Sequence, residues 1–324
     1  MPAHLRFQPE PWMTHMVTTR CLEGQPLLRP SERANQLIVG CFAYAQRRFA
    51  GRVELHHIAV MSNHYHALLS AEDQPTLSAF MCLLNGSLAK ELGGLHDAHG
   101  HFWHRRYAKH QLLDEEALSD AYRYLFANSV KEGLVEHPRD WPGVHGHAAL
   151  CEGERLEGVW VDRTALNAAT RRARAQKRAL PAEEEFTERL CLALTLPPMW
   201  RALTVSEHEA RCRAWADEVS HECAERRRRA GERVLGAEGV LRQDLRQRRR
   251  VTPSPRPLCR AGCPERFGRF VRQYVEFAAQ YREASMRLRE GLAVRGVAPR
   301  VSFPPGGVAL FGGIPKRLPP PRTP

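Results

Sequence analysis

The order of secondary-structure elements in the first 131 residues limits the fold of this chain more than any other feature. Apolar residues recur at helical spacing in three segments, and β-forming residues cluster in four others. We predict strands at 14–21, 53–61, 64–70 and within 102–113, and helices at 31–49, 76–92 and from residue 114 onward. The first six elements follow the split βαβ order, which forms an antiparallel sheet with helices on one face. The sequence therefore predicts an α+β, ferredoxin-like fold here.

A change in composition near residue 150 divides the chain. Fourteen of the 16 histidines lie at or before His147, whereas residues 225–257 hold eleven arginines and four acids. Helical patterns dominate the second part, and we predict helices at 167–180, 183–194, 206–229 and 265–291, a linker at 251–258 and core packing for the aromatic stripe of the last helix. We thus expect a domain at 1–150, a mainly α-helical basic extension at 151–300 and an extended Pro/Gly-rich tail at 301–324.

Composition excludes several classes of protein. A hydrophobic content of 43% suffices for a sizeable core, which argues against a wholly disordered chain. No run of about 18 apolar residues occurs, so we expect no membrane-spanning helix. The start has no apolar signal-peptide core and the nine cysteines are scattered, so we expect reduced thiols and a cytoplasmic location. A formal net charge of +12 predicts a polyanionic partner, most simply nucleic acid.

Two histidines at strand spacing form the first part of a candidate site. His64 and His66 follow the tight turn Ser62-Asn63, and residues two apart on a strand point to the same face. Two imidazoles a few ångströms apart can bind one metal ion. Such a pair taken alone is more often a chance arrangement on a surface, so a third group is needed to support this interpretation.

The helix that begins at Asp114 supplies candidates for the third group. Tyr124 and Asn128 are four residues apart and share a helix face. The Asn128 amide oxygen is a hard ligand, and the Tyr124 phenol can act as a nucleophile when a nearby cation favours its ionised form. Tyr122 continues the apolar face of this helix, so we assign it to the core.

These residues carry a resemblance to a known family. The segment MSNHYHALL resembles the His-hydrophobic-His strand of the single-tyrosine HUH transposases, and YLFANSVKEGLVEHPRDWPG is similar to the tyrosine helix of their REP-associated branch. WMTHMVTTRC and FWHRRYAKHQLLDEEAL resemble the first strand and the strand before that helix. The likeness covers residues from about 10 to 145 in the same order.

The resemblance implies a DNA transposase or strand transferase that cleaves and rejoins single-stranded DNA. By motif position, Tyr124 would be the nucleophile that forms a 5′-phosphotyrosine, and His64, His66 and Asn128 would bind Mg²⁺ or Mn²⁺. The implied partner is single-stranded DNA with hairpin or palindromic element ends, which implies a bacterial, nucleoid-associated protein. Relatives include both homodimers and monomers. The family's Met-Pro-Asn is Met-Ser-Asn here, and its Asn-Pro-Val is Asn128-Ser129-Val130, a change that can extend the helix and alter the orientation of Asn128.

Basic residues outside this motif are candidate DNA contacts. Arg105 and Arg106 alternate with aromatic residues, a mixture that suits stacking on bases and binding to phosphates, whereas Trp103 in the same stretch fits a core position. Lys109 follows on the same predicted strand. In the second part, the runs at 226–229 and 248–250, the latter comprising Arg248, Arg249 and Arg250, would add salt-dependent affinity, or else form a solvated charged face.

Two other functional classes remain open at this stage. A domesticated, sequence-specific DNA-binding protein could keep the fold without transposition, although the intact set of His64, His66, Tyr124 and Asn128 favours the enzyme. A zinc protein could use the four histidines at positions 96, 99, 101 and 104, but their spacing matches no closed zinc pattern. Cys259 and Cys263 form a CxxxC with no second pair nearby, which disfavours zinc there too.

Overall fold

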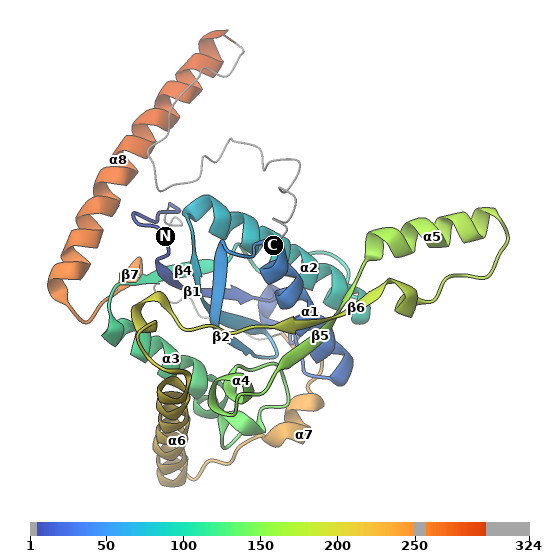
Figure 1. Ribbon diagram of the computed structural model, residues 1–324, viewed down its shortest axis with the longest axis horizontal. Coiled ribbons are helices and arrows are strands. Elements are labelled where there is room, and N and C mark those ends of the chain that lie inside the picture. Colours follow the sequence, from blue (N-terminus) through green and yellow to red (C-terminus); the bar gives the residue numbers. More distant parts are fainter. Residues whose placement is uncertain (1–4, 249–256, 296–324) are drawn as a thin grey trace.

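The sheet at the centre of the molecule has the predicted strand order. The computed structural model describes residues 5–248 and 257–295, with side chains of the second range through residue 290. The strands of the central sheet are β1 (Thr14–Arg20), β2 (Val53–Val60), β3 (His64–Ala71), β4 (Ala108–Leu112) and the two-residue β7 (Cys259–Arg260). They are arranged in the order β2-β3-β1-β4-β7 (Figure 1). The first four strands pair antiparallel, and β7 adds a parallel edge next to β4. The ferredoxin-like prediction is confirmed.

Two capped helices cover one face of this sheet. Helix α1 (Glu32–Arg48) begins where the Ser31 side chain accepts a hydrogen bond from Ala34 N at 3.1 Å. Helix α2 (Gln74–Leu95) begins in the same way, with the Asp73 carboxylate accepting from Thr76 N at 2.7 Å. Their apolar stripes pack on the inward residues of β1, β2 and β3 in one buried cluster. Both helices therefore lie on one face, as predicted.

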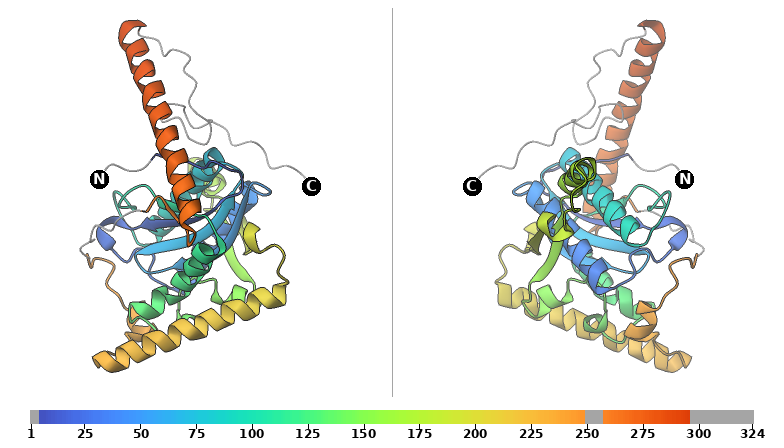
Figure 2. Two further views of the ribbon diagram at one scale, coloured as in Figure 1. Left: turned by 90° about the vertical axis from the view of Figure 1, so that its left-hand side faces the viewer. Right: turned by 90° about the vertical axis from the view of Figure 1, so that its right-hand side faces the viewer.

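The opposite face carries α3 (Glu115–Lys131) and, outside it, α6 (Val205–Ala230). Met16, Ala59 and Leu68 of the sheet pack against the apolar face of α3 in a second buried cluster. Cys212, Ala216, Val219 and Cys223, which recur at helical spacing along α6, complete this cluster. Figure 2 shows α3 lying between the sheet and the long α6. The sheet thus lies between α1 and α2 on one face and α3, backed by α6, on the other.

The chain beyond residue 150 forms a strand ribbon as well as helices. After the short α4 (His147–Cys151), β5 (Leu156–Val161) and β6 (Thr187–Leu192) pair antiparallel alongside α1, and α5 (Arg163–Ala175) lies between them in the chain. The helix predicted at 183–194 is therefore wrong. Residues 183–186 form a single 3₁₀ turn, and the following residues extend because their backbone pairs with β5.

The last elements complete the described fold. Helices α7 (Gly236–Leu241) and α8 (Pro264–Arg295) follow α6, and three further 3₁₀ turns lie at Leu22–Gly24, Pro138–Asp140 and Pro198–Trp200. The aromatic stripe of α8 is partly buried as predicted: Phe270 and Phe277 pack on Phe7, but Phe267 is exposed. The tail at 301–324 and most of the predicted linker at 251–258 lie outside the described residues. No helix in the described ranges combines the length and apolar character needed to cross a membrane.

Candidate active site

The two histidines of β3 lie side by side on the sheet face that α3 covers. The ring centroids of His64 and His66 are 4.9 Å apart. His66 is almost fully buried, with 3% of its surface exposed, whereas His64 is half-buried. In the register with β1, Thr18 stands opposite His66 and Arg20 opposite His64. The spacing of the pair therefore yields two converging imidazoles, as the sequence predicts.

Hydrogen bonds fix the orientation of both rings. The Asn63 amide oxygen accepts from His64 Nδ1 at 2.7 Å, which leaves a lone pair on Nε2. The Thr18 hydroxyl lies 2.7 Å from His66 Nδ1, and His66 Nε2 is buried without a hydrogen-bond partner. Partners of this kind on the second ring nitrogen hold ligand histidines in a fixed orientation. Sequence reasoning misses Thr18 and Asn63, because strand register decides the first and turn geometry the second.

The surroundings favour the neutral form of both imidazoles. Burial, followed by the charges of Arg20 and Lys131, lowers the pKa of His64 to about 3. Burial also lowers the pKa of His66 well below its ordinary value, with further contributions from His64, Lys131 and Arg20. Because metal ions bind the neutral ring, the two histidines are ready to act as ligands at neutral pH.

Helix α3 places Tyr124 and Asn128 over these two histidines. The Tyr124 ring centroid lies 5.3 Å from that of His66, and Asn128 Nδ2 lies 3.2 Å from His64 Nε2. Four helical residues rise about 6 Å, and two strand residues span about 6.6 Å, so the two pairs match in spacing. The four residues singled out in the sequence therefore meet in one place.

Helix α3 begins at a side-chain cap and continues past the position where the predicted orientation of Asn128 is in question. The Asp114 carboxylate caps the first turn, accepting from Ala117 N at 2.9 Å. The helix continues through Ser129, where the resembled family has proline, and ends at Lys131. Asn128 is nonetheless 2% exposed and turned to His64, so the serine does not divert it from the site. Tyr122 is fully buried and its hydroxyl donates to His56 O at 3.2 Å, which confirms its core assignment.

Two cations that the sequence did not reveal lie at the site. The Lys131 ammonium is 3.6 Å from the centroid of the Tyr124 ring, a cation–π contact between residues two helical turns apart. Arg20 stands opposite His64 at the end of β1. A helical-wheel plot of α3 would have placed Lys131 on the Tyr124 face. Together these side chains give the site a positive field suited to a phosphate group.

The donor set fits a divalent cation. It comprises the buried, unpartnered His66 Nε2, the lone pair of His64 Nε2 and the Asn128 amide, whose oxygen faces the histidines after a half-turn of the amide group. In the described part of the chain, no group of three His, Cys, Asp or Glu residues is arranged to hold a metal ion. The zinc interpretation of the histidines at 96–104 thus finds no such cluster among the described residues.

The DNA contacts predicted in and before β4 differ in their exposure and in their contacts. Arg105 and Arg106 are exposed in the segment before β4, and His104 N in the same segment donates to Arg20 O at 2.9 Å, so this segment borders the site. Lys109 points elsewhere: its ammonium donates to Phe7 O at 2.7 Å, and burial followed by the charge of Arg6 lowers its pKa. This placement argues against DNA contact by Lys109. Its position in a strand gave no sign of this bond to the N-terminal segment.

The arginine runs of the second part also divide into different roles. Arg226 Nη2 donates to Lys131 O at 2.7 Å, and Arg227, which is 5% exposed, donates from Nη1 to Val130 O at 3.1 Å. These two residues bind the carbonyl end of the tyrosine helix. Arg248 is exposed and forms an ion pair with Glu23 at 2.9 Å. Arg249 and Arg250 lie outside the described residues.

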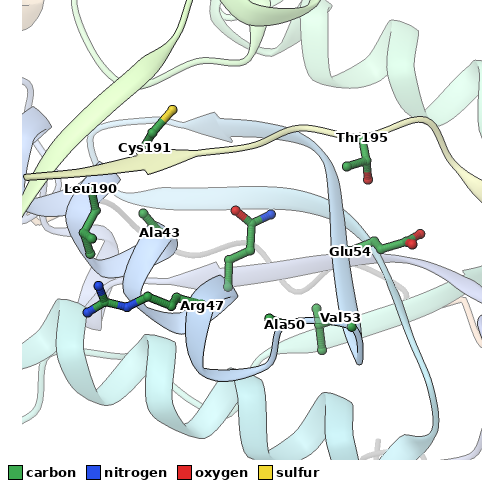
Figure 3. A pocket seen from close by; sticks show the side chains of 10 residues that line it. Ala43, Arg47, Ala50, Val53, Glu54, Leu190, Cys191 and Thr195 are labelled. Atoms are coloured by element: carbon green, nitrogen blue, oxygen red, sulfur yellow. The ribbon is translucent and has the colours of Figure 1, made fainter. Parts of the chain in front are cut away.

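A cavity of about 440 Å³ lies on the other side of the sheet (Figure 3). Residues of α1, the start of β2 and the end of the β5–β6 ribbon line it, among them Arg47, Glu54, Leu190 and Cys191. Its two charged side chains are already paired, Arg47 with Glu188 and Glu54 with Arg201. The cavity therefore adds nothing to the chemistry of the histidine–tyrosine site.

Three of the solved structures that are similar to this chain illustrate the likeness. They are a REP-associated tyrosine transposase bound to a REP hairpin (18% identity, TM-score 0.39, covering 47% of this chain and 87% of that one), a protein of Deinococcus radiodurans described as a candidate transposase (19%, 0.28, 35% and 88%), and a bacterial tRNA(His) guanylyltransferase-like protein in complex with ATP (8%, 0.30, 66% and 92%). At these TM-scores the likeness carries no statement about activity. No protein-family profile and no curated protein matches the chain.

Proposed function

We propose that this protein is a metal-dependent DNA strand transferase of the transposase type, which cleaves and rejoins single-stranded DNA through Tyr124. The observation that carries the proposal is the meeting of two orientated histidines with a tyrosine and an amide on the facing helix, with His66 Nε2 buried and unpartnered. The resemblance of the motifs to the single-tyrosine HUH transposases points to the same chemistry.

The proposed reaction exchanges one phosphate ester for another. The Tyr124 hydroxyl oxygen forms a bond to phosphorus while the bond from phosphorus to the 3′ oxygen breaks. The phenol loses its proton, the departing 3′ oxygen gains one, and the products are a 5′-phosphotyrosine and a free 3′ hydroxyl. Attack by a 3′ hydroxyl on the phosphotyrosine rejoins the strands. Because the number of phosphate ester bonds is unchanged, no ATP is needed.

The chain's own residues position the reacting groups. His64, His66 and the Asn128 amide oxygen would hold Mg²⁺ or Mn²⁺, which when bound would polarise the scissile phosphate as a Lewis acid. Lys131, on the face of the Tyr124 ring, stabilises the negative charge that develops on the phenol and the phosphate oxygens. Arg20 and the exposed Arg105 and Arg106, on segments that border the site, would bind the adjoining backbone phosphates.

The decisive test compares two tyrosine variants. With a hairpin-bearing single-stranded oligonucleotide and Mg²⁺, the parent chain should form a covalent adduct that survives a denaturing gel and disappears with EDTA. Tyr124→Phe should lose the adduct by about 10³-fold or more while DNA binding stays within a few-fold. Tyr44→Phe is the matched control, since its ring stacks on Trp160 away from the site and should keep full activity. An undiminished adduct in Tyr124→Phe would overturn the proposal.

The same experiment separates the enzyme from a DNA-binding protein of the same fold. A protein that only binds DNA hairpins would keep its hairpin affinity in every variant and would form no covalent adduct with any divalent metal ion. His64→Ala provides a second criterion, because loss of a ligand should abolish Mg²⁺-dependent cleavage. Activity of His64→Ala equal to that of the parent would remove its role as a ligand.

A further inference from the structure

Helix α5 lies away from the body of the protein. It is held at the end of the β5–β6 ribbon, and Figure 1 shows it projecting beyond the layers described above. None of its residues is buried. We call residues 162–186, which join the two strands, the arm. An element that contributes so little to the core is a candidate for binding a partner.

The base of the arm is rigidly anchored. Gly158 of β5 and Gly40 of α1 approach so closely that a Cβ atom on Gly40 would lie 1.8 Å from Val159 O. The Tyr44 and Trp160 rings stack with centroids 3.8 Å apart. Arg163, at the first residue of α5, pairs with the buried Glu91 at 2.7 Å and also with Glu183 at the other end of the arm. Contacts of β5 and of both ends of the arm thus fix the direction in which the arm projects.

Charge is distributed unevenly along the arm. Its acids lie at the base, where Glu183 also pairs with Arg33, and no acid occurs at positions 164–182. The far end holds five exposed cations within eight residues: Arg171, Arg172, Arg174, Lys177 and Arg178. Among the described residues of the arm, Arg163 is the cation that forms ion pairs, and it lies at the base. The helix dipole favours the first three cations but leaves their mutual repulsion uncompensated.

The turn after α5 retains a cation at a sterically unfavourable position. Lys177 has a φ of +53°, the left-handed conformation that glycine or asparagine adopts more readily at a helix end. A lysine there is less favourable than a glycine, because its Cβ atom crowds the neighbouring carbonyl oxygen. The Lys177 side chain is exposed, so it adds no buried contact to the fold. Its charge is therefore the property that the position supplies.

We propose that the far end of the arm binds the phosphate backbone of double-stranded DNA. The five cations match a polyanion in charge. The arm from 163 to 182 contains no Phe, Tyr or Trp, so it has no platform on which unpaired bases could stack. Its apolar residues are mainly alanines, which make too small an apolar face for insertion into a membrane. Duplex phosphate is thus the partner that the chemistry favours.

This inference rests on DNA being the substrate of the proposed function, but it can be tested separately. The full chain in EDTA cannot cleave, so duplex binding can be measured by fluorescence anisotropy over a range of salt concentrations. A variant with glutamine at the five positions should bind a 20-base-pair duplex about tenfold or more weakly at 100 mM salt. The slope of log K against log salt should fall by about 0.9 for each phosphate that the variant no longer neutralises. A variant with lysine at all five should retain both affinity and slope.

Two controls separate the arm from other causes. Glutamine at five exposed arginines of α8 (Arg269, Arg272, Arg282, Arg287 and Arg289) removes the same net charge and should leave the slope nearly unchanged. A 20-nucleotide unpaired strand should lose little affinity in the arm variant. An equal loss in both glutamine variants, an unchanged slope, or arm-dependent binding to anionic vesicles without duplex binding would overturn the proposal. Adduct formation with Mg²⁺ at saturating DNA reports on Tyr124 independently, so failure of the arm and failure of the enzyme give different results.

Discussion

The reactive groups of the site depend on neighbours that take no part in the reaction. Thr18 and Asn63 each bind the Nδ1 atom of one histidine, so both Nε2 atoms point toward α3. Thr18 reaches His66 from the facing position on β1, and Asn63 reaches His64 from the turn residue directly before it. The affinity for a metal ion should therefore depend on these two side chains almost as much as on the ligands.

Replacing Thr18 by valine tests this dependence. The two side chains have nearly the same shape, but valine cannot hydrogen-bond to His66 Nδ1. The Mg²⁺ concentration for half-maximal adduct formation should rise about 10- to 100-fold, with a smaller change in the rate at saturating Mg²⁺. Thr18→Ser, which keeps the hydroxyl, serves as control and should stay within a few-fold of the parent. A metal dependence unchanged by valine would show that the hydrogen bond does not orient the ring.

Residue spacing predicts the core of the site because strand and helix periodicities are local. Two residues on a strand and four on a helix specify which side chains share a face, and this places His64 with His66 and Tyr124 with Asn128. The partners of these residues depend on which strands pair and in what register, which spacing alone does not contain. For the same reason the sequence predicts a DNA contact at Lys109, although its ammonium binds Phe7 O.

At the level of elements, α6 acts as a support for the tyrosine helix. Arg123, next to Tyr124, pairs with Glu218 and Glu222 of α6. Arg227 of α6 binds the Val130 carbonyl near the C-terminal end of α3. The carbonyl end of a helix carries partial negative charge, which a buried guanidinium satisfies. Part of the basic extension thus holds the turn that bears Asn128 and Lys131.

Replacing Arg227 by methionine should weaken this support. Methionine fills a similar volume but removes the charged donor to the Val130 carbonyl, which keeps only backbone donors such as Gly133 N. The free energy of unfolding should therefore fall by about 1–3 kcal/mol in urea titrations. Adduct formation at saturating Mg²⁺ and DNA should slow by about tenfold, because Asn128 and Lys131 lose their fixed positions. The exposed Arg228→Gln should change stability by less than about 0.5 kcal/mol. Equal effects of the two substitutions would contradict the proposed support.

The elements of the first part are predictable from the sequence, whereas the β5–β6 ribbon of the second part is not. Capping residues and apolar stripes of α1, α2 and α3 are visible in the sequence, so their positions agree with expectation. The helical pattern of residues 183–194 predicts a helix there, which the structure replaces by a 3₁₀ turn and strand β6. The strand residues extend because β5 supplies hydrogen-bond partners and α1 supplies a surface, and both are distant in the sequence.

At the scale of the whole molecule, the parts on either side of residue 150 pack together. Val161 and Leu192 of the ribbon belong to the same buried cluster as α1 and α2, while α6 completes the cluster around α3. A very close approach occurs between Gly40 and Gly158, where two backbones meet without side chains between them. The extension is therefore built onto both faces of the ferredoxin-like core.

The glycine contact can be tested by adding a single methyl group. Gly40→Ala would place its Cβ atom 1.8 Å from Val159 O, so the ribbon must shift, and the free energy of unfolding should fall by about 1–3 kcal/mol or more. Gly86→Ala is the matched control, because a Cβ atom on Gly86 in α2 meets nothing within 4 Å. That substitution should stabilise the protein by about 0.5–1 kcal/mol through helix propensity. A Gly40→Ala protein as stable as the parent would contradict the close packing.

If Tyr124 forms the covalent bond to DNA, peptide mass spectrometry of the adduct should find the nucleotide on that residue. Trypsin cuts after Arg123 and Lys131, so Tyr124 falls in the peptide YLFANSVK, while Tyr122 falls in the peptide that ends at Arg123. After nuclease digestion of the adduct, we expect the mass of a 5′-linked nucleotide on YLFANSVK, localised to its tyrosine. The same added mass on the Tyr122 peptide or on any other residue would contradict the account.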